Sequence, residues 1–516
     1  MKSLSILGTS SNAGKTWVAT AFCAWLRAQG VRVAPFKAQN MSNNAWATLD
    51  GGEMARAQAV QAEACGLMPD ARMNPILLKP SGPGGSQLVL LGRAQGHQPA
   101  AEYYRHIDRL WEIVKTTLDD WRSRCDILVQ EGAGSPVELN LMDRDLVNLR
   151  PMRHLDGRFL LVGDIDRGGI YAQLAGTWAL LPPQDRPRSL GAIVNRFRGD
   201  RSLFPHPQAW LAPHAPGLDI AGTLPFRPDL QPEEEDGLAA ADEDRGAGAS
   251  ICWIRLPRAA NLTDCQPWWG DTGIRTRWVS TPQALADARA IIIPGSKNTL
   301  ADLRWLRENG LAAAIIAAAK RGIPIVGLCG GFQLLGARLI DPEGVAGDAG
   351  DQPGLGLLPH QTVFQREKTV RQVTARCASR RWTAYEIHMG RDEPPAPRPA
   401  PNANASPPPP IPGETRNQTD SGKPPPPAPA APLQTVEDAH GSRPEGLRSG
   451  NIIGTYLHGW FEVPETRRLL TAAAGIAEHR PHPVPWAEQR QQIYRQMAAH
   501  LESHLNLTAV KRYLDL

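Results

Sequence analysis

Residues 3–16 read Ser-Leu-Ser-Ile-Leu-Gly-Thr-Ser-Ser-Asn-Ala-Gly-Lys-Thr, and this stretch decides the fold of the N-terminal half. A short apolar run ends in a glycine-rich turn from Gly8 to Gly14, and a helical pattern follows. Such a turn between a strand and a helix lets backbone N–H groups and the positive end of the helix surround phosphate oxygens. The stretch therefore predicts a phosphate-binding loop.

The side chains of this loop fit a nucleotide. The Lys15 ammonium group can neutralise the β- and γ-phosphates, and the Thr16 hydroxyl can bind Mg²⁺. Five residues separate Gly8 from Gly14, one more than in the common motif, and this longer form is typical of dethiobiotin-synthetase-like and MinD-like ATPases. We expect ATP and Mg²⁺ to bind here, with nucleotide contacts from Gly8, Thr9, Ser10, Asn12, Gly14, Lys15 and Thr16.

Short apolar runs alternate with helical stretches up to about residue 230. The runs occupy residues 4–7, 31–36, 127–130, 159–162, 192–195 and 220–224. This alternation favours a mostly parallel sheet with helices on both faces, so we expect an α/β fold with an ATP-binding domain over residues 1–230.

Acidic side chains follow several of these runs, at the edge where an open α/β sheet binds its ligands. Glu131 ends one strand and precedes a glycine-rich stretch, and Asp164 and Asp166 end another. We predict Glu131 as a metal ligand, with Glu53 as a second candidate. Lys37, just beyond the second strand, can reach the γ-phosphate or an anionic substrate.

A second α/β unit is expected over residues 251–516, after a linker at 231–250. Its strands are predicted at residues 251–256, 291–293 and 323–328, with helices near 299–307 and 311–320. Sixteen of the 47 prolines lie between residues 394 and 432. This composition offers little to bury, so residues 392–448 are interpreted as a disordered Pro-rich insertion in the second domain.

The second domain contains a candidate nucleophile. An apolar strand runs into Gly327-Leu-Cys329-Gly330-Gly331, the nucleophile-elbow pattern with cysteine in place of serine. Small residues permit the sharp turn, and the helix N-terminus that follows favours the thiolate. The alternative is that Cys329 is a buried small hydrophobic residue, which is the usual role of cysteine.

A cysteine nucleophile needs a base and an oxyanion site. His458 ends an apolar strand late in the same domain and is the predicted base. Backbone N–H groups at Gly295 and Gly330 are expected to face the oxyanion of a bound glutamine.

Overall composition limits the class of ligand. Lys plus Arg number 56 against 52 Asp plus Glu, so the net charge of +4 suggests neither nucleic acid nor a membrane surface as partner. Seven scattered cysteines without a CxxC pair indicate reduced thiols. No window is apolar enough for a membrane span, so we expect a cytoplasmic protein acting on a small molecule.

Together, the two sites predict amide formation driven by ATP with ammonia taken from glutamine. Cys329 would attack the carboxamide of glutamine, and His458 would protonate the leaving ammonia. In the other domain a substrate carboxylate would attack the γ-phosphate of ATP, and ammonia would displace phosphate from the resulting acyl phosphate. Because ammonia is mostly protonated in water at pH 7, we expect a shielded passage between the sites.

Six further motifs occur in order along the chain: Lys37-Ala-Gln-Asn-Met-Ser-Asn-Asn44, Gly52-Glu-Met-Ala-Arg-Ala-Gln58, Val162-Gly-Asp-Ile-Asp-Arg-Gly-Gly169, Pro294-Gly-Ser-Lys-Asn-Thr299, Tyr385-Glu-Ile-His-Met-Gly390 and Gly454-Thr-Tyr-Leu-His-Gly459. In these motifs the sequence resembles the cobyric acid synthase family of the cobalamin pathway.

The resemblance implies a class I glutamine-amidotransferase-like C-terminal domain and amidation of the b, d, e and g carboxylates of adenosylcobyrinic acid a,c-diamide, a corrinoid. It also implies that Cys329 and His458 are catalytic, that Asn195 contacts adenine, and that Glu53 and Glu131 hold the metal. Residues 37–44 become a candidate loop facing the corrinoid, and the oligomeric state stays open.

Two points remain undecided at the level of sequence. Many related glutaminases carry Glu two residues after the histidine, where this chain has Trp460, so a dyad or another partner such as Glu462 is considered. The alternatives in function are cobyrinic acid a,c-diamide synthase, a MinD- or ParA-like ATP-switched positioning protein, and a nucleotide-binding carrier with an inactive glutaminase domain.

Overall fold

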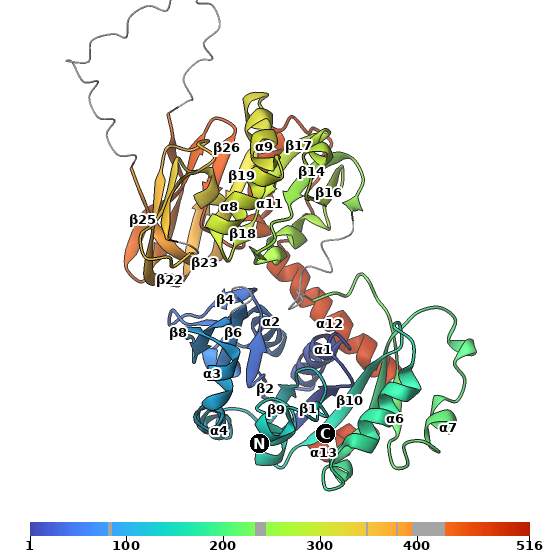
Figure 1. Cartoon of the computed structure of the whole chain (residues 1–516). Coiled ribbons are helices and arrows are strands. Elements are labelled where there is room, and N and C mark those ends of the chain that lie inside the picture. Colours follow the sequence, from blue (N-terminus) through green and yellow to red (C-terminus); the bar gives the residue numbers. More distant parts are fainter. Residues whose placement is uncertain (81–84, 233–243, 347–348, 378–379, 395–428) are drawn as a thin grey trace, which may run out of the picture.

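The computed structural model describes residues 1–80, 85–232, 244–346, 349–377, 380–394 and 429–516, which form two α/β domains (Figure 1). The N-terminal domain is built on six parallel strands in the order β12-β11-β10-β1-β9-β2. Their bounds are β1 Lys2–Gly8, β2 Val33–Phe36, β9 Ile127–Glu131, β10 Arg158–Asp164, β11 Ser189–Phe197 and β12 Ile220–Pro225. All six predicted strands are thus present in one sheet.

Helices cover both faces of this sheet because the central strands are apolar and buried on both sides. The helices of the domain are α1 Lys15–Ala28, α2 Arg56–Cys65, α3 Ala100–Arg105, α4 Ile107–Trp121, α5 Leu149–His154, α6 Ile170–Leu180 and α7 Pro207–Leu211. The carboxyl ends of β1, β9 and β2 meet at one edge, which places the phosphate loop beside Glu131.

Small sheets lie on the side of this domain that faces the second domain, where Figure 1 shows β4, β6 and β8 below β22 and β23. A four-stranded sheet has the order β3-β6-β7-β8, and β4 pairs with β5. The bounds are β3 Gln39–Met41, β4 Ala45–Ala47, β5 Glu53–Ala55, β6 Ile76–Pro80, β7 Ser86–Leu90 and β8 Arg93–Gln98.

The C-terminal domain contains a 12-stranded mixed sheet in the order β13-β16-β14-β17-β19-β26-β25-β24-β22-β20-β21, with β23 paired to β22. Its parallel part comprises β14 Ala249–Ile254, β16 Ile274–Val279, β17 Ala288–Ile293, β19 Ile325–Leu328 and β26 Ile452–Thr455. The other strands are β13 Arg245–Gly246, β20 Arg338–Asp341, β21 Gly350–Pro353, β22 Gln361–Cys377, β23 Arg380–Glu393, β24 Ala431–Asp438 and β25 Gly441–Ser449.

The helices of this domain are α8 Thr299–Glu308, α9 Leu311–Lys320, α10 Gly330–Leu335 and α11 Pro464–Ala473. A separate two-stranded pairing joins β15 Ala259–Ala260 to β18 Gly295–Ser296. This pairing brings the segment after β14 next to the strand that precedes α8.

The expectation that residues 392–448 lack structure is wrong at both ends. β23 continues to Glu393, and β24 and β25 pair with β22 and β26. Val436 is fully buried, so this part of the segment contributes to the core. Residues 395–428 lie outside the described residues.

The expected domain boundary also needs correction, because the last two helices pack on the N-terminal domain. α12 Trp486–His504 packs against α1 and places Met497 and Leu501 in one apolar core with Phe22, and α13 Thr508–Leu514 contributes to the same core. Figure 1 shows α12 crossing from the second domain to the first, with the C-terminus close to the N-terminus.

Among the described residues, the structure has no helix with the length and apolar character needed to cross a membrane.

Candidate active sites

The phosphate loop is closed around the side chain of Lys15. Its Nζ donates to the backbone oxygens of Ser10 (2.9 Å) and Gly134 (3.0 Å). Gly8 is required here, since a Cβ at that position would lie 2.9 Å from Cδ and Nζ of Lys15. Gly14 directly precedes α1. Its φ of 92° is a left-handed conformation, which glycine adopts without strain.

A buried cluster lies beside this loop. Thr16 Oγ1 donates to Glu131 Oε1 (2.8 Å), Lys37 Nζ donates to the same oxygen (2.9 Å), and Gln61 Nε2 donates to Glu131 Oε2 (2.5 Å). Burial alone would raise the pKa of Glu131, but the Lys37 ammonium group and these hydrogen bonds lower it below its usual value. Glu131 is therefore a carboxylate at neutral pH, with an oxygen next to the Thr16 hydroxyl.

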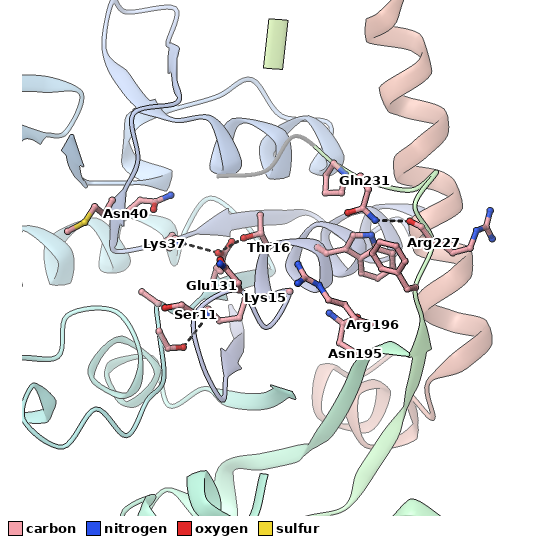
Figure 2. Close-up of a pocket in the computed structure, with 18 of the residues that line it drawn as sticks. Ser11, Lys15, Thr16, Lys37, Asn40, Glu131, Asn195, Arg196, Arg227 and Gln231 are labelled. Atoms are coloured by element: carbon pink, nitrogen blue, oxygen red, sulfur yellow. Dashed lines mark hydrogen bonds and ion pairs between the residues drawn. The ribbon is translucent and has the colours of Figure 1, made fainter. Parts of the chain in front are cut away.

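A cavity of about 330 Å³ opens in front of the cluster, and Figure 2 shows the side chains that surround it. Of the residues predicted for the nucleotide and its metal, Asn12, Gly14, Lys15, Thr16, Lys37, Glu131 and Asn195 line this cavity. Thr9 and Ser10 support the loop: Thr9 Oγ1 donates to Gln173, and the Ser10 carbonyl holds Lys15. The structure thus brings most of the predicted set to one place.

Asn195 has a role in the loop itself. Its Nδ2 donates to the Ala13 carbonyl (3.0 Å), and a Cβ on Gly14 would lie 2.0 Å from that nitrogen. Asn195 therefore packs directly against the loop. Beyond it, Arg196, Pro225, Phe226 and Arg227 form the other wall of the cavity.

Glu53, predicted as a metal ligand, lies elsewhere. Its buried carboxylate pairs with Lys79 and with Lys368 of the second domain (2.5 Å to Lys368 Nζ). Burial would raise the pKa of Glu53, but the two ammonium groups hold it well below its usual range. The structure does not bring Glu53 to the predicted metal site, because both carboxylate oxygens bind lysines at the domain interface and Glu53 is not among the lining residues of the phosphate cavity.

Asp164 and Asp166, which end the strand at 159–162 in the sequence interpretation, are ion-pair partners. Asp164 Oδ2 lies 3.4 Å from Arg196 Nη1, and Asp166 pairs with Arg198 at 3.0 Å. Asp164 Oδ1 also accepts the backbone N–H of Asp166 (2.8 Å). These carboxylates hold the turn after β10 and do not line the cavity.

In the second domain Cys329 occupies a strained turn between β19 and α10. Its φ of 52° and ψ of −110° are uncommon for a residue with a side chain, and such strain is concentrated at functional sites. Gly331 permits the turn, since a Cβ there would lie 2.1 Å from the Ile293 carbonyl. The pattern predicted from sequence, a nucleophile elbow, is thus present.

His458 follows β26, the strand beside β19, so the two catalytic candidates end neighbouring parallel strands. Gly295 lies beside both: a Cβ there would be 3.3 Å from His458 Cε1 and 3.7 Å from Cys329 Cβ. A Cβ on Gly330 would lie 2.6 Å from the backbone nitrogen of Ser296, so β18 packs against the start of α10. The predicted oxyanion residues therefore surround the nucleophile.

The third member of the site is Asp264, which the sequence interpretation missed. Asp264 Oδ2 lies 2.7 Å from His458 Nδ1, and Asp264 Oδ1 accepts the backbone N–H of Gly459 (2.8 Å). Asp264 lies in η6, a 3₁₀-helix over Leu262–Trp268, and is buried. Cys329, His458 and Asp264 together form a triad in which the acid precedes the nucleophile in the chain.

The charges of the triad reinforce one another. Burial would lower the pKa of His458, but Asp264 and Cys329 raise it to about 10. An imidazolium held between a carboxylate and a sulfur places a proton donor next to the nucleophile. The geometry and the charges therefore both suit covalent catalysis by cysteine.

The alternatives considered for the third member are not supported. Trp460 is buried and donates its indole N–H to Gln434 Oε1 (3.0 Å). Glu462 accepts from Arg490 of α12 (2.9 Å). Since Asp264 already binds Nδ1 of His458, neither a dyad nor Glu462 describes this site.

Family models match both domains. Residues 4–239 match the CobQ/CobB/MinD/ParA nucleotide binding domain, and residues 250–405 match the CobB/CobQ-like glutamine amidotransferase domain.

Curated relatives match nearly the whole chain. The cobyric acid synthase of Variovorax paradoxus is 42% identical over 91% of this chain and 92% of its own length. The cobyric acid synthase of Nocardia farcinica is 40% identical over 99% of this chain and 96% of its own length. That of Roseiflexus castenholzii is 48% identical over 75% of this chain and 79% of its own length. These relatives share one description and span both domains.

Proposed function

From the premise that this chain belongs to the cobyric acid synthase family, we propose that it amidates the b, d, e and g carboxylates of adenosylcobyrinic acid a,c-diamide to give adenosylcobyric acid, using ATP and glutamine. The observation that carries the proposal is the Cys329–His458–Asp264 triad on the same chain as the Lys15 phosphate loop. The activity of a MinD- or ParA-like switch protein does not require such a triad.

The glutaminase half of the reaction follows from the triad. The Cys329 thiolate attacks the carboxamide carbon of glutamine while backbone N–H groups near Gly295 and Gly330 stabilise the oxyanion. His458 then gives its proton to the leaving nitrogen, and ammonia departs as the thioester forms. Water, deprotonated by His458, clears the thioester to glutamate and restores the thiolate.

The ligase half takes place at the phosphate loop. A corrinoid carboxylate attacks the γ-phosphorus of ATP and ADP leaves, with Lys15 stabilising the charge on the transferred group. Ammonia then attacks the acyl phosphate at its carbonyl carbon, and phosphate leaves. Four such cycles give the four amides.

The residues beside the loop fit Mg²⁺. The Thr16 hydroxyl and the Glu131 carboxylate are oxygen donors 2.8 Å apart, the kind of donor that this ion prefers. When bound, Mg²⁺ would supply positive charge that polarises the phosphate oxygens.

Ammonia would have a short path between the sites. Asn40 and Met41 line the phosphate cavity, whereas Asn43 lines the pocket that contains Cys329 and His458. Three residues of chain span at most about 10 Å, so the two cavities approach each other along this loop. Met41 is 53% exposed, and we propose that its side chain contacts the corrinoid. Transfer through this region keeps ammonia away from bulk water.

The proposal predicts four successive single amidations of adenosylcobyrinic acid a,c-diamide with ATP, Mg²⁺ and unlabelled glutamine. Mass spectrometry follows the steps, and ¹⁵N-ammonium in the buffer tests the passage, because shielded transfer leaves the amides mostly unlabelled. Two amidations of cobyrinic acid, with none of the a,c-diamide, would identify the sister enzyme. Amides labelled to the level of the buffer would disprove the shielded passage.

Asp264→Asn is expected to lower the rate of glutamine hydrolysis by about 10²- to 10⁴-fold, because an amide cannot hold His458 in the required charge and orientation. Glutamate release in the presence of ATP and the corrinoid measures this step, and the amidation rate with ammonium is the control.

Asp271→Asn is not a suitable control variant for Asp264→Asn, since Asp271 forms its own buried cluster with Arg467 and His479. Asp287, a largely exposed acid in the same domain, offers the matched variant Asp287→Asn. Full glutaminase activity in Asp264→Asn would contradict the triad.

A further inference from the structure

Two buried hydrogen bonds join the domains close to the triad. The backbone N–H of Asn261 donates to Asn44 Oδ1 (2.8 Å), and the backbone N–H of Ala45 donates to Asn261 Oδ1 (2.9 Å). Asn44 and Asn261 are 6% and 5% exposed, so both bonds are shielded from water. Each asparagine thus accepts a backbone N–H of the other segment.

Asn261 sets the start of the helix that carries Asp264. It precedes η6 with a φ of 54° and a ψ of 47°, a left-handed conformation that costs free energy for a residue with a side chain. The backbone N–H of Asp264 donates to the Asn261 carbonyl (3.2 Å). The position of Asp264 therefore depends on how Asn261 is held.

The same N-terminal segment also contacts the histidine side of the triad. The Trp46 ring lies 4.3 Å from the ring of Tyr385, and the Tyr385 ring stacks on His458 at 5.1 Å. The backbone N–H of His458 donates to the Tyr385 carbonyl (2.9 Å). Residues 44–46 thus contact Asn261 and Tyr385, the neighbours of the acid and of the base of the glutaminase.

We propose that Asn44 is a positioning residue for the glutaminase: through Asn261 it holds η6 so that Asp264 orients His458. The N-terminal domain then completes the alignment of a triad whose three members all lie in the other domain. The inference rests on the glutaminase half of the proposed function and is independent of the acceptor.

The proposed role of Asn44 gives a second function to the loop over residues 37–44. The family resemblance suggested that this loop faces the corrinoid. Asn40 and Met41 line the phosphate cavity, while Asn44 acts on the triad a few residues later. The loop therefore links the place where ammonia is used to the place where it is made.

The experiment compares Asn44→Ala with Asn44→Asp in the full chain. Removing the acceptor is expected to lower kcat for glutamate release about 10- to 100-fold, as small misplacements of catalytic groups do, with the KM for glutamine within about twofold. Ammonium-dependent amidation should fall clearly less than glutamate release, since Asn44 does not line the phosphate cavity. Asn44→Asp keeps an oxygen in place and should restore most of kcat.

Two further variants separate positioning from loss of packing. Asn261→Gly tolerates the left-handed conformation but removes the second bond, so it should reduce glutamate release in the same way. Gln372→Met removes a different hydrogen bond between the domains, from Gln372 Nε2 to the Ala47 carbonyl (2.7 Å), and should leave the ratio of the two activities unchanged.

A readout without turnover completes the test. The rate at which iodoacetamide alkylates Cys329, followed by mass spectrometry, should fall in Asn44→Ala at pH 7, because a misaligned His458 activates the cysteine nucleophile less. Unchanged alkylation and glutamate release in Asn44→Ala would overturn the inference, as would an equal loss of both activities that Asn44→Asp does not restore. If the wild-type protein fails to amidate the corrinoid, the proposed acceptor is wrong, yet these two measurements still decide the role of Asn44.

Discussion

Cys329→Ala is expected to reduce glutamine-dependent amidation by about 10⁴-fold or more while ammonium still supports the reaction at the wild-type rate. In the proposed mechanism the thioester forms at the Cys329 sulfur. Cys329 follows β19 and His458 follows β26, while Asp264 lies within η6. The phosphate loop and Glu131 belong to the other domain, so their geometry does not depend on this side chain.

The measurement compares amide formation from glutamine with that from ammonium at a mildly alkaline pH, where more of the ammonium is present as ammonia. Cys377→Ala is the matched control, since Cys377 is a partly exposed thiol at the end of β22. Wild-type activity with glutamine in Cys329→Ala would refute the assignment of the nucleophile. It would also favour the alternative of a nucleotide-binding carrier with an inactive glutaminase domain.

The N-terminal sheet and the two motifs were accessible from the sequence because each depends on residues that are close together in the chain. Strands such as β1 and β10 are buried on both faces and read as continuous apolar runs. The phosphate loop and the elbow at Cys329 are turns whose glycines and functional side chains are neighbours. Local patterns of this kind specify local geometry.

Asp264 was not accessible in this way. It is separated from His458 by 194 residues, and the β15–β18 pairing that brings η6 to the triad involves only two residues on each strand. The nearest signal in the sequence is Asn261, whose tolerance of left-handed backbone suits the start of a tight helix. That signal indicates a turn but not a catalytic acid.

The helices at the C-terminus illustrate a related limit. Tyr494, Met497 and Leu501 recur at helical spacing and predict one buried face on α12. Periodicity does not say which surface covers that face, and the structure shows that it is α1 of the other domain. The position of Glu53 away from the phosphate loop could not be predicted for a similar reason: its two lysine partners, Lys79 and Lys368, are distant in the chain.

Lys15→Ala is expected to lower amidation by about 10³-fold or more with both glutamine and ammonium as nitrogen donors. The Lys15 ammonium group is held by the Ser10 and Gly134 carbonyls at the centre of the loop, where the charge of the transferred phosphoryl group develops. Alanine would leave the backbone N–H groups of the loop in place, so ATP could still bind while the acyl phosphate failed to form.

Three rates distinguish this outcome from a general loss of folding: amidation with glutamine, amidation with ammonium, and alkylation of Cys329 by iodoacetamide. The first two should fall together and the third should persist, because the triad lies in the other domain. Lys115→Ala, at a partly exposed position of α4, is the control for removal of a lysine from the same domain. Retained amidation with ammonium in Lys15→Ala would show that the loop does not serve the phosphoryl transfer, and the ligase half of the mechanism would have to be assigned to other residues.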